Sequence, residues 1–224
     1  MRLAIFDLDN TLLGGDSDHA WGDYLISAGL VDAEQHQAQN DAFYAQYQAG
    51  TLKIEEYVAF AANPIAGLSP QRLQTMHEEF MAHSIQPMLL PASEALLEQH
   101  RKAGDFLLII TATNRFITGP IARLLGVDEL LATELETVDG VYTGKMTGVP
   151  CFREGKVTRL QQWLERYNAE NPQQPLDMEN SVFYSDSFND LPLLEQAGEA
   201  VAVDPDDTLR RIAGDRDWRI LSLR

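Results

Sequence analysis

Short apolar runs alternate with segments of helical periodicity along most of this chain. The apolar runs have the length of strands and few polar residues, which is typical of parallel strands covered by helices on both faces. These predicted strands span residues 2–7, 106–110, 130–135, 181–184 and 200–203, and residues 138–146 resemble a hairpin that turns at Asp139-Gly140. The predicted helices span residues 91–103, 115–125, 156–167, 191–197 and 206–213. The pattern predicts an α/β fold with a Rossmann-like parallel sheet core and helices on both faces.

The stretch from Asp16 to His83 differs, because helical periodicity fills it and no strand-like run interrupts it. Gly29, Gly50 and Asn63-Pro64 break it into shorter pieces, since glycine and proline are the strongest local breakers of a helix. We therefore predict a small α-helical cap over residues 16–85, inserted after the first strand. The core domain would then consist of residues 1–15 and 86–224.

Composition narrows the possible partners. The chain has 224 residues, with 17 basic against 34 acidic side chains and a net charge of −17. A surface this acidic argues against nucleic acid or an anionic membrane as partner. The chain reaches its first strand too early for a signal-peptide core, and no apolar run approaches a membrane-spanning length, so we expect a cytoplasmic protein. We expect this protein to be a monomer or a homodimer. Cys151 is the only cysteine, and we expect a small, partly buried residue rather than a catalytic thiol.

The first strand leads directly into two carboxylates, Asp7 and Asp9, which are one residue apart. In a continuing strand such side chains project to the same face, where two ionised carboxylates would repel each other. They therefore call for a cation or for very different environments. The pair suits a reaction in which one carboxylate attacks a substrate and the other carries a proton.

Further polar residues follow the other predicted strands or open the next helix. Open parallel sheets bind ligands beyond the carboxyl ends of their strands, so we expect these residues to converge at one edge. They are Thr111, Lys156, Asp186 and Asp190. Several carboxylates with so little basic compensation need a divalent ion, and a site with few oxygen ligands and retained water suits Mg²⁺.

These residues, in this order and spacing, resemble the four motifs of the haloacid dehalogenase-like (HAD) phosphohydrolases. The resemblance covers essentially the whole chain, and the helical insert resembles the cap of the phosphoserine phosphatase-like subgroup. It implies that Asp7 is a nucleophile that forms an aspartyl-phosphate, and that Asp9 is a general acid and then a general base. It also implies a Mg²⁺ site made by the Asp7 and Asp186 side chains and the Asp9 carbonyl.

For the remaining motif residues, the resemblance implies that Thr111 and Lys156 bind phosphoryl oxygens and that Asp190 orients the metal shell or Lys156. The predicted set of phosphate- or substrate-binding residues is Asn10, Thr111, Ala112, Lys156, Asp16 and Arg115. Arg115 is included because it closely follows Thr111, although it could instead be an exposed arginine in the first turn of a helix.

Each of these residues also has a purely structural interpretation. Asp9-Asn10-Thr11 alone is compatible with a turn and a helix cap, and the segment from Asp186 to Asp190 with the start of a helix. Lys156 alone could be an ordinary solvated lysine. The joint occurrence of the motifs after successive strands favours the catalytic interpretation, a phosphomonoester hydrolase that acts on a small phosphorylated metabolite.

The substrate prediction depends on the cap. In the resembling phosphatases an acid that corresponds to Asp16 contacts a substrate amine, while Asp16 and Asp18 could equally be an N-cap pair. The arginine that clamps a substrate carboxylate in those enzymes falls on Ala59 here, with Lys53 as a substitute. An alkyl side chain cannot offset a buried carboxylate, so we predict histidinol phosphate in preference to phosphoserine. The same motifs would also suit a phosphotransferase that uses an alcohol acceptor, or a non-catalytic binding module on the same fold.

Overall fold

The computed structural model describes residues 1–224, and its architecture is α/β, as the sequence predicts. One sheet holds every strand in the order β4-β3-β2-β1-β5-β6-β7, and every neighbouring pair is parallel except β3 with β4. The strands are β1 (Leu3–Phe6), β2 (Phe106–Asn114), β3 (Glu129–Val138), β4 (Val141–Thr147), β5 (Ser181–Ser185), β6 (Glu199–Val203) and β7 (Arg219–Leu221). The predicted turn at Asp139-Gly140 joins β3 to β4, whereas the short edge strand β7 was not predicted from the sequence.

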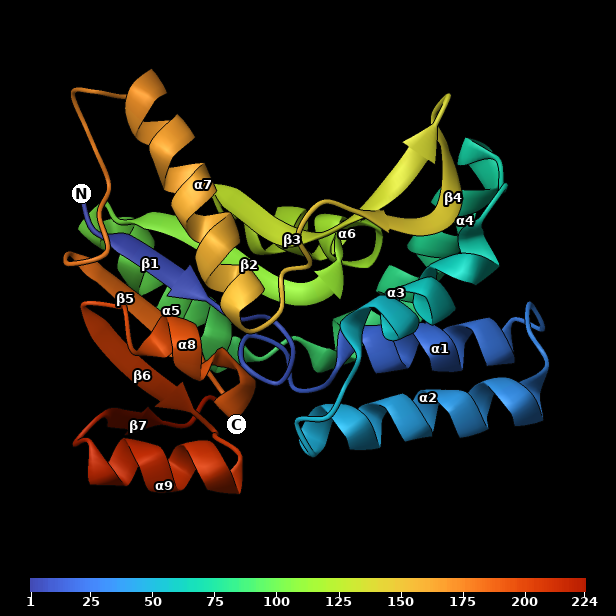
Figure 1. The fold of residues 1–224 in the computed structure, drawn as a ribbon, viewed down its shortest axis with the longest axis horizontal. Helices are drawn as coiled ribbons and strands as arrows, with labels where there is room; N and C mark the ends of the chain where they lie inside the picture. The colour runs from blue at the N-terminus through green and yellow to red at the C-terminus, as the bar shows by residue number, and fades with distance from the viewer.

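Helices cover both faces of the sheet (Figure 1). Alternate residues of β1 divide between two hydrophobic clusters, because successive side chains of a strand point to opposite faces. Ala4 and Phe6 pack with α5 and α6, whereas Leu3 and Ile5 pack with α7, α8 and α9. These helices are α5 (Pro91–Ala103), α6 (Arg115–Leu125), α7 (Glu154–Glu170), α8 (Leu191–Leu194) and α9 (Asp207–Asp215). The helix that we expected over residues 191–197 is thus shorter than predicted.

Between the loop that follows β1 and the start of α5 the chain forms helices and no strand, and these helices lie to one side of the sheet (Figure 1). The main helices of this helical segment are α1 (Ser17–Ser27), α2 (Ala33–Gln48), α3 (Ile54–Ala62) and α4 (Pro70–Phe80), and the shorter turns are Asn63–Ile65, Met81–Ile85 and Gln86–Met88. Three of these helices begin at a polar N-cap residue, whose side chain accepts hydrogen bonds from backbone N–H groups of the first turn. The N-cap residues are Asp16 for α1, Asp32 for α2 and Ser69 for α4. None of the helices combines the length and the apolar character that a membrane crossing requires.

The helical segment shares its core with the rest of the molecule. Trp21 of α1 is 1% exposed, and its ring lies 5.1 Å from that of Phe80 and 5.3 Å from that of Phe116 in α6. All three belong to the same cluster of buried residues as Ala4 and Phe6 of β1. The division at residues 16–85 stays a prediction about domain organisation, and the packing joins the two parts through one continuous core.

Candidate active site

The carboxyl ends of the central strands bring the predicted motif residues together. β1 lies between β2 and β5, so Asp7 at the end of β1 has Thr111 of β2 on one side and Asp186 after β5 on the other. The backbone N–H of Asp7 still donates to the carbonyl of Tyr184 at 2.9 Å, which fixes the start of the loop after β1. Lys156 reaches the same edge from the first turn of α7.

Asp7, Lys156 and Asp190 form a buried charge cluster. The Lys156 Nζ donates to Asp7 Oδ1 at 2.8 Å and to Asp190 Oδ2 at 2.7 Å, and Ser185 Oγ also donates to Asp190 at 2.7 Å. Burial raises the pKa of Asp7 to about 7, against the lowering effect of Lys156. Burial opposes the charge of Lys156, but Asp190 and Asp7 outweigh it and raise the pKa of the ammonium above its ordinary range. Lys156 is therefore a fixed cation beside the Asp7 carboxylate.

Thr11 connects Asp7 to Asp186. Its hydroxyl lies 3.0 Å from Asp186 Oδ1 and 3.5 Å from Asp7 Oδ2, and it accepts from the Asp186 backbone N–H at 3.0 Å. Burial raises the pKa of Asp186 well above its ordinary value, and the charges of Asp7 and Asp190 raise it further. Carboxylates this close together disfavour one another's ionised form. From the sequence, Thr11 was considered only as part of a turn, and this role was missed.

The oxygen atoms available at this site fit Mg²⁺, which keeps several water ligands, better than a metal that is coordinated by protein side chains alone. No group of three His, Cys, Asp or Glu side chains could hold a metal by itself. The resembling motifs use two carboxylates, here Asp7 and Asp186, with a backbone carbonyl, here that of Asp9. A small set of oxygen ligands that leaves room for water is typical of Mg²⁺ sites.

Asp9 is held apart from this cluster. Its carboxylate accepts from the Ser17 backbone N–H at 2.6 Å and from Thr113 Oγ1 at 2.8 Å, while Thr111 Oγ1 lies 3.5 Å away. Burial raises the pKa of Asp9 to about 6, with a further contribution from the charge of Asp16. A carboxyl whose pKa is near the pH at which an enzyme operates can both donate and accept a proton. Thr113 was not predicted from the sequence, although residues two apart in β2 share a face with Thr111.

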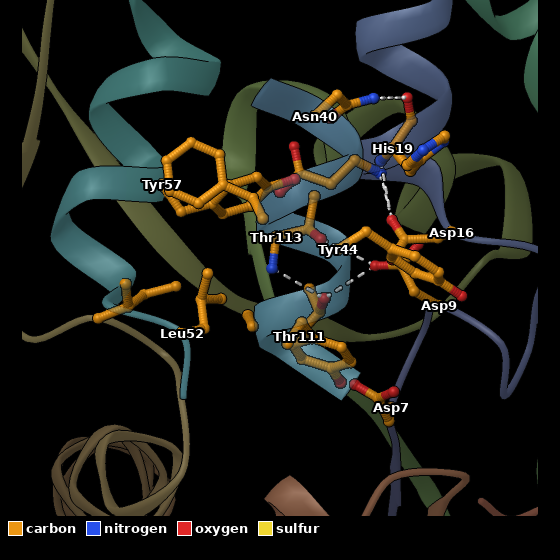
Figure 2. Close-up of a pocket in the computed structure, with 15 residues that line it drawn as sticks. Asp7, Asp9, Asp16, His19, Asn40, Tyr44, Leu52, Tyr57, Thr111 and Thr113 are labelled. Carbon is orange, nitrogen blue, oxygen red and sulfur yellow. Dashed lines mark hydrogen bonds between the residues drawn. The ribbon is translucent and has the colours of Figure 1, made fainter. Parts of the chain in front are cut away.

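A cavity of about 50 Å³ extends from Asp7 and Asp9 into the helical segment (Figure 2). It has room for a group the size of a few water molecules. Its aromatic lining comes from α2 and α3, and Leu52 lies two residues before α3; its polar lining comes mainly from the start of α1 and from β2. The lining residues beyond those already described are Asp16, Asp18, His19, Asn40, Phe43, Tyr44, Tyr47, Leu52, Ile54, Tyr57 and Ala112.

Two acids in the wall of this cavity differ in their bonding. Asp16 Oδ1 accepts from the backbone N–H groups of Asp18 and His19, both at 2.9 Å, so Asp16 caps α1 and also lines the cavity. Asp18 is 7% exposed, and its Oδ1 has no hydrogen-bond partner. Burial raises the pKa of Asp16 and raises that of Asp18 well above its ordinary value. The two interpretations offered for Asp16, cap and substrate contact, are therefore compatible.

Comparison with known proteins identifies the family of this chain. The family model described as haloacid dehalogenase-like hydrolase matches residues 4–195, a span that contains Asp7, Asp9, Thr111, Lys156 and Asp186. The chain belongs to this family. A histidinol-phosphatase from Neisseria meningitidis is 47% identical to it over 224 residues, covering 100% of this chain and 99% of the relative. A phosphoserine phosphatase from Mycobacterium tuberculosis is 33% identical over 230 residues, covering 99% of this chain and 70% of the relative.

Solved structures show the same fold. A protein of unknown function from Bordetella pertussis aligns over 100% of this chain and 99% of its own, with a TM-score of 0.90 and 42% identity. A substrate-bound phosphoserine phosphatase aligns over 100% of this chain and 93% of its own, with a TM-score of 0.68 and 16% identity. Together with the relatives, the family places this chain among the HAD phosphatases, which are phosphoric monoester hydrolases.

Other predicted site residues lie elsewhere in this HAD phosphatase. Arg115 does not point to the phosphoryl site: its Nε donates to Glu134 Oε1 at 2.8 Å and its guanidinium also donates to the Leu130 carbonyl at 2.6 Å. The first turn of α6 directs this side chain toward β3, so its expected contact with phosphate is wrong. Lys53 is also directed outward, with its side chain 72% exposed and paired with Glu56 at 3.0 Å, and Ala59 is exposed on α3.

Asn10 and Ala112 have different places. Ala112 lines the cavity beside Thr111. Asn10 adopts a left-handed φ of 59°, its backbone N–H donates to Gly15 at 2.9 Å, and it lines a second hollow that contains Asp186 rather than the cavity. The N–H of Asn10 is thus occupied in the turn after Asp9, and the predicted substrate contact of Asn10 has no support from its position.

Arg153 links the helical segment to the core of the HAD phosphatase. Its guanidinium donates to Asn189 Oδ1 at 3.0 and 3.1 Å and to the carbonyl of Gly50, the turn between α2 and α3. Asn189 in turn donates to the Tyr47 carbonyl at 3.2 Å. These bonds hold the end of α2 over the loop that carries Asp186. Nothing in the sequence pattern indicated this contact.

Proposed function

We propose that this HAD phosphatase hydrolyses histidinol phosphate with Mg²⁺ as cofactor, through an aspartyl-phosphate on Asp7. A bound Mg²⁺ would neutralise charge on the transferring phosphoryl group and on the carboxylates of Asp7 and Asp186. The chain's own residues supply the nucleophile, the proton carrier and the fixed cation.

In the first step an Asp7 carboxylate oxygen attacks phosphorus, and the bond from phosphorus to the ester oxygen breaks. Lys156 keeps Asp7 oriented through Oδ1 and adds a positive charge next to the phosphoryl oxygens. Asp9 gives its proton to the departing alcohol oxygen. Ser17 N–H and Thr113 Oγ1 hold the Asp9 carboxyl in place for that transfer.

In the second step water attacks the phosphorus of the aspartyl-phosphate. Asp9, now ionised, accepts the proton of that water, so that inorganic phosphate leaves and Asp7 returns to its starting state. The raised pKa of Asp9, about 6, suits a group that must carry a proton in one step and release it in the other.

One observation carries the substrate proposal: the cavity is lined by Asp7, Asp9, Asp16 and Asp18 and by no lysine or arginine. A leaving group with positive charge would be stabilised there, whereas the carboxylate of phosphoserine would face these aspartates without a lysine or arginine to pair with. Histidinol phosphate carries an amine and an imidazole and has no carboxylate. The 47% identical relative named histidinol-phosphatase supports the same choice.

The test compares kcat/KM for L-histidinol phosphate and O-phospho-L-serine in the presence of Mg²⁺. We expect a preference for histidinol phosphate on the order of 100-fold or more, because the site offers no partner to the carboxylate. Equal values, or a preference for phosphoserine, would contradict the substrate proposal and leave the phosphatase assignment intact.

A further inference from the structure

Asp18 is a buried acid of the helical segment whose bonding is incomplete, and the neighbouring Ser17 Oγ also has no hydrogen-bond partner. The side chain of Asp18 is more than nine-tenths buried, it lines the cavity, and its Oδ1 has no hydrogen-bond partner. A buried carboxylate oxygen without a donor is unfavourable, and a ligand that brings an N–H to this oxygen would remove the deficit. The roles in the reaction sequence, nucleophile, proton carrier and metal ligand, leave Asp18 unused.

The surroundings of Asp18 indicate the shape of that ligand. The cavity that Asp18 lines has aromatic and aliphatic walls from Phe43, Leu52, Ile54 and Tyr57, and the hydroxyls of Tyr57 and Thr113 lie near the Asp18 carboxylate. Aromatic walls favour a flat ring, and they favour a cationic ring more than a neutral one. A five-membered ring with a polar N–H edge meets these conditions.

The arrangement of three acids indicates a direction for the substrate. Asp9 accepts from the Ser17 backbone N–H, and Asp16 accepts from the Asp18 backbone N–H, so the carboxylates of Asp9, Asp16 and Asp18 gather around the start of α1 and line one cavity. An ester whose oxygen meets Asp9 would place an amine on the next carbon near Asp16, and a ring further along the chain near Asp18.

We infer that Asp18 binds an N–H of the imidazole ring of the leaving group and sets the preference of the enzyme for an imidazole over a phenyl ring. This inference rests on the proposed function and assigns the ring, as distinct from the amine, to Asp18. Asp18 is thus a specificity residue, and it takes no part in the bond changes at phosphorus.

The experiment measures kcat/KM for L-histidinol phosphate and for L-phenylalaninol phosphate, which has the same amine and a ring without N–H. The wild-type enzyme should prefer the imidazole substrate by on the order of 100-fold or more. Asp18→Leu, which is similar in shape and apolar, should reduce that ratio by at least about 50-fold, and Asp18→Asn, which keeps an acceptor oxygen, by about 10-fold. The exposed acid Asp32, which caps α2, offers the control Asp32→Asn with an unchanged ratio.

Product binding supplies a readout that does not depend on turnover. The Kd of L-histidinol, measured by calorimetry, should rise at least about 10-fold in Asp18→Asn, whereas that of L-phenylalaninol should change less than about twofold. An unchanged selectivity ratio in both folded variants would overturn the role of Asp18 alone. A wild-type enzyme without activity on histidinol phosphate would overturn the proposed function, and the role of Asp18 with it.

Discussion

In the half of the active site that faces the phosphoryl group, the charges of Asp7, Lys156 and Asp190 pair with one another at 2.7 to 2.8 Å. In the half formed by the helical segment, Asp16 and Asp18 line a cavity that has aromatic and aliphatic walls and no lysine or arginine. We call these the transfer half and the leaving-group half. The first half is assembled in the absence of a substrate, whereas in our proposal a cationic leaving group completes the second half.

The difference separates chemistry from selectivity. Fixed charges around Asp7 act on the phosphoryl group, which is the same in every phosphomonoester. Unsatisfied groups around Asp18 act on the part of the substrate that varies. Changes in the transfer half should therefore affect all substrates equally, and changes in the leaving-group half should affect them selectively.

The largest expected effect comes from Asp7→Asn. An amide is a poor nucleophile, so kcat should fall by on the order of 10⁴-fold or more with every phosphomonoester tested. Because burial already disfavours the ionised carboxylate, the melting temperature should not fall at pH 8. Steady-state kinetics on histidinol phosphate and an aryl phosphate, together with thermal unfolding, measure both effects.

The exposed acid Asp215 on α9 gives a matched control, since Asp215→Asn should leave the kinetics unchanged. Retention of more than about one-tenth of kcat in Asp7→Asn would contradict the assignment of the nucleophile.

A second change in the transfer half, Lys156→Met, should destabilise the metal-free protein by about 3–5 kcal/mol at pH 8.5, because it leaves buried carboxylates without their cation. Without Lys156 the pKa of Asp7 rises further above its ordinary value of 3.8. A carboxyl with a raised folded pKa contributes stability at low pH and loses it as the pH rises through that pKa. The loss should therefore be smaller at about pH 6 than at pH 8.5.

Urea unfolding at the two pH values measures this difference. Lys102→Met, at an exposed lysine of α5, should change the free energy of unfolding by less than about 0.5 kcal/mol at either pH. A loss in Lys156→Met that is independent of pH would show that the carboxylates are not the source of the destabilisation.

The smallest expected effect lies where the two halves meet. Arg153→Leu removes the bonds to Asn189 and to the Gly50 carbonyl, so the turn between α2 and α3 should open more readily. We expect KM for histidinol phosphate to rise by about 10-fold, from the loss of charge-assisted hydrogen bonds, with a much smaller change in kcat. Backbone amides between Tyr47 and Leu52 should exchange faster with solvent.

Arg166→Leu, at an exposed arginine of the same helix α7, is the control for loss of a cation. A fall in kcat with an unchanged KM would assign Arg153 to the transfer half instead.

The transfer half was largely predictable from the sequence, because strand ends in a parallel sheet converge whatever the details of packing. Asp7, Thr111 and Asp186 each follow an apolar run, and the structure places them together. The predictions that failed concern side-chain direction. Arg115 is near Thr111 in sequence, yet the turn into α6 directs it to Glu134.

The leaving-group half was less predictable, because its residues come from separate helices and no single periodic pattern in the sequence connects them. The contact between Arg153 and Gly50 joins segments 103 residues apart, and neither residue type signals the other. Thr113 had a signal that was available, its strand position two residues after Thr111. The unsatisfied oxygen of Asp18 depends on what packs around it, which only the folded structure shows.

The continuous core that joins Trp21 to Phe80 and Phe116 has a consequence for how such enzymes diversify. A cap with its own hydrophobic core could be exchanged between relatives as an independent unit. Exchange of α1–α4 here would remove the aromatic side chains that pack against Phe116 of α6. Uncovering buried aromatic rings is unfavourable in water. We therefore expect relatives to acquire new substrates by substitution of single residues in the cavity wall. The helical segment and α6 should change together, because they share one core.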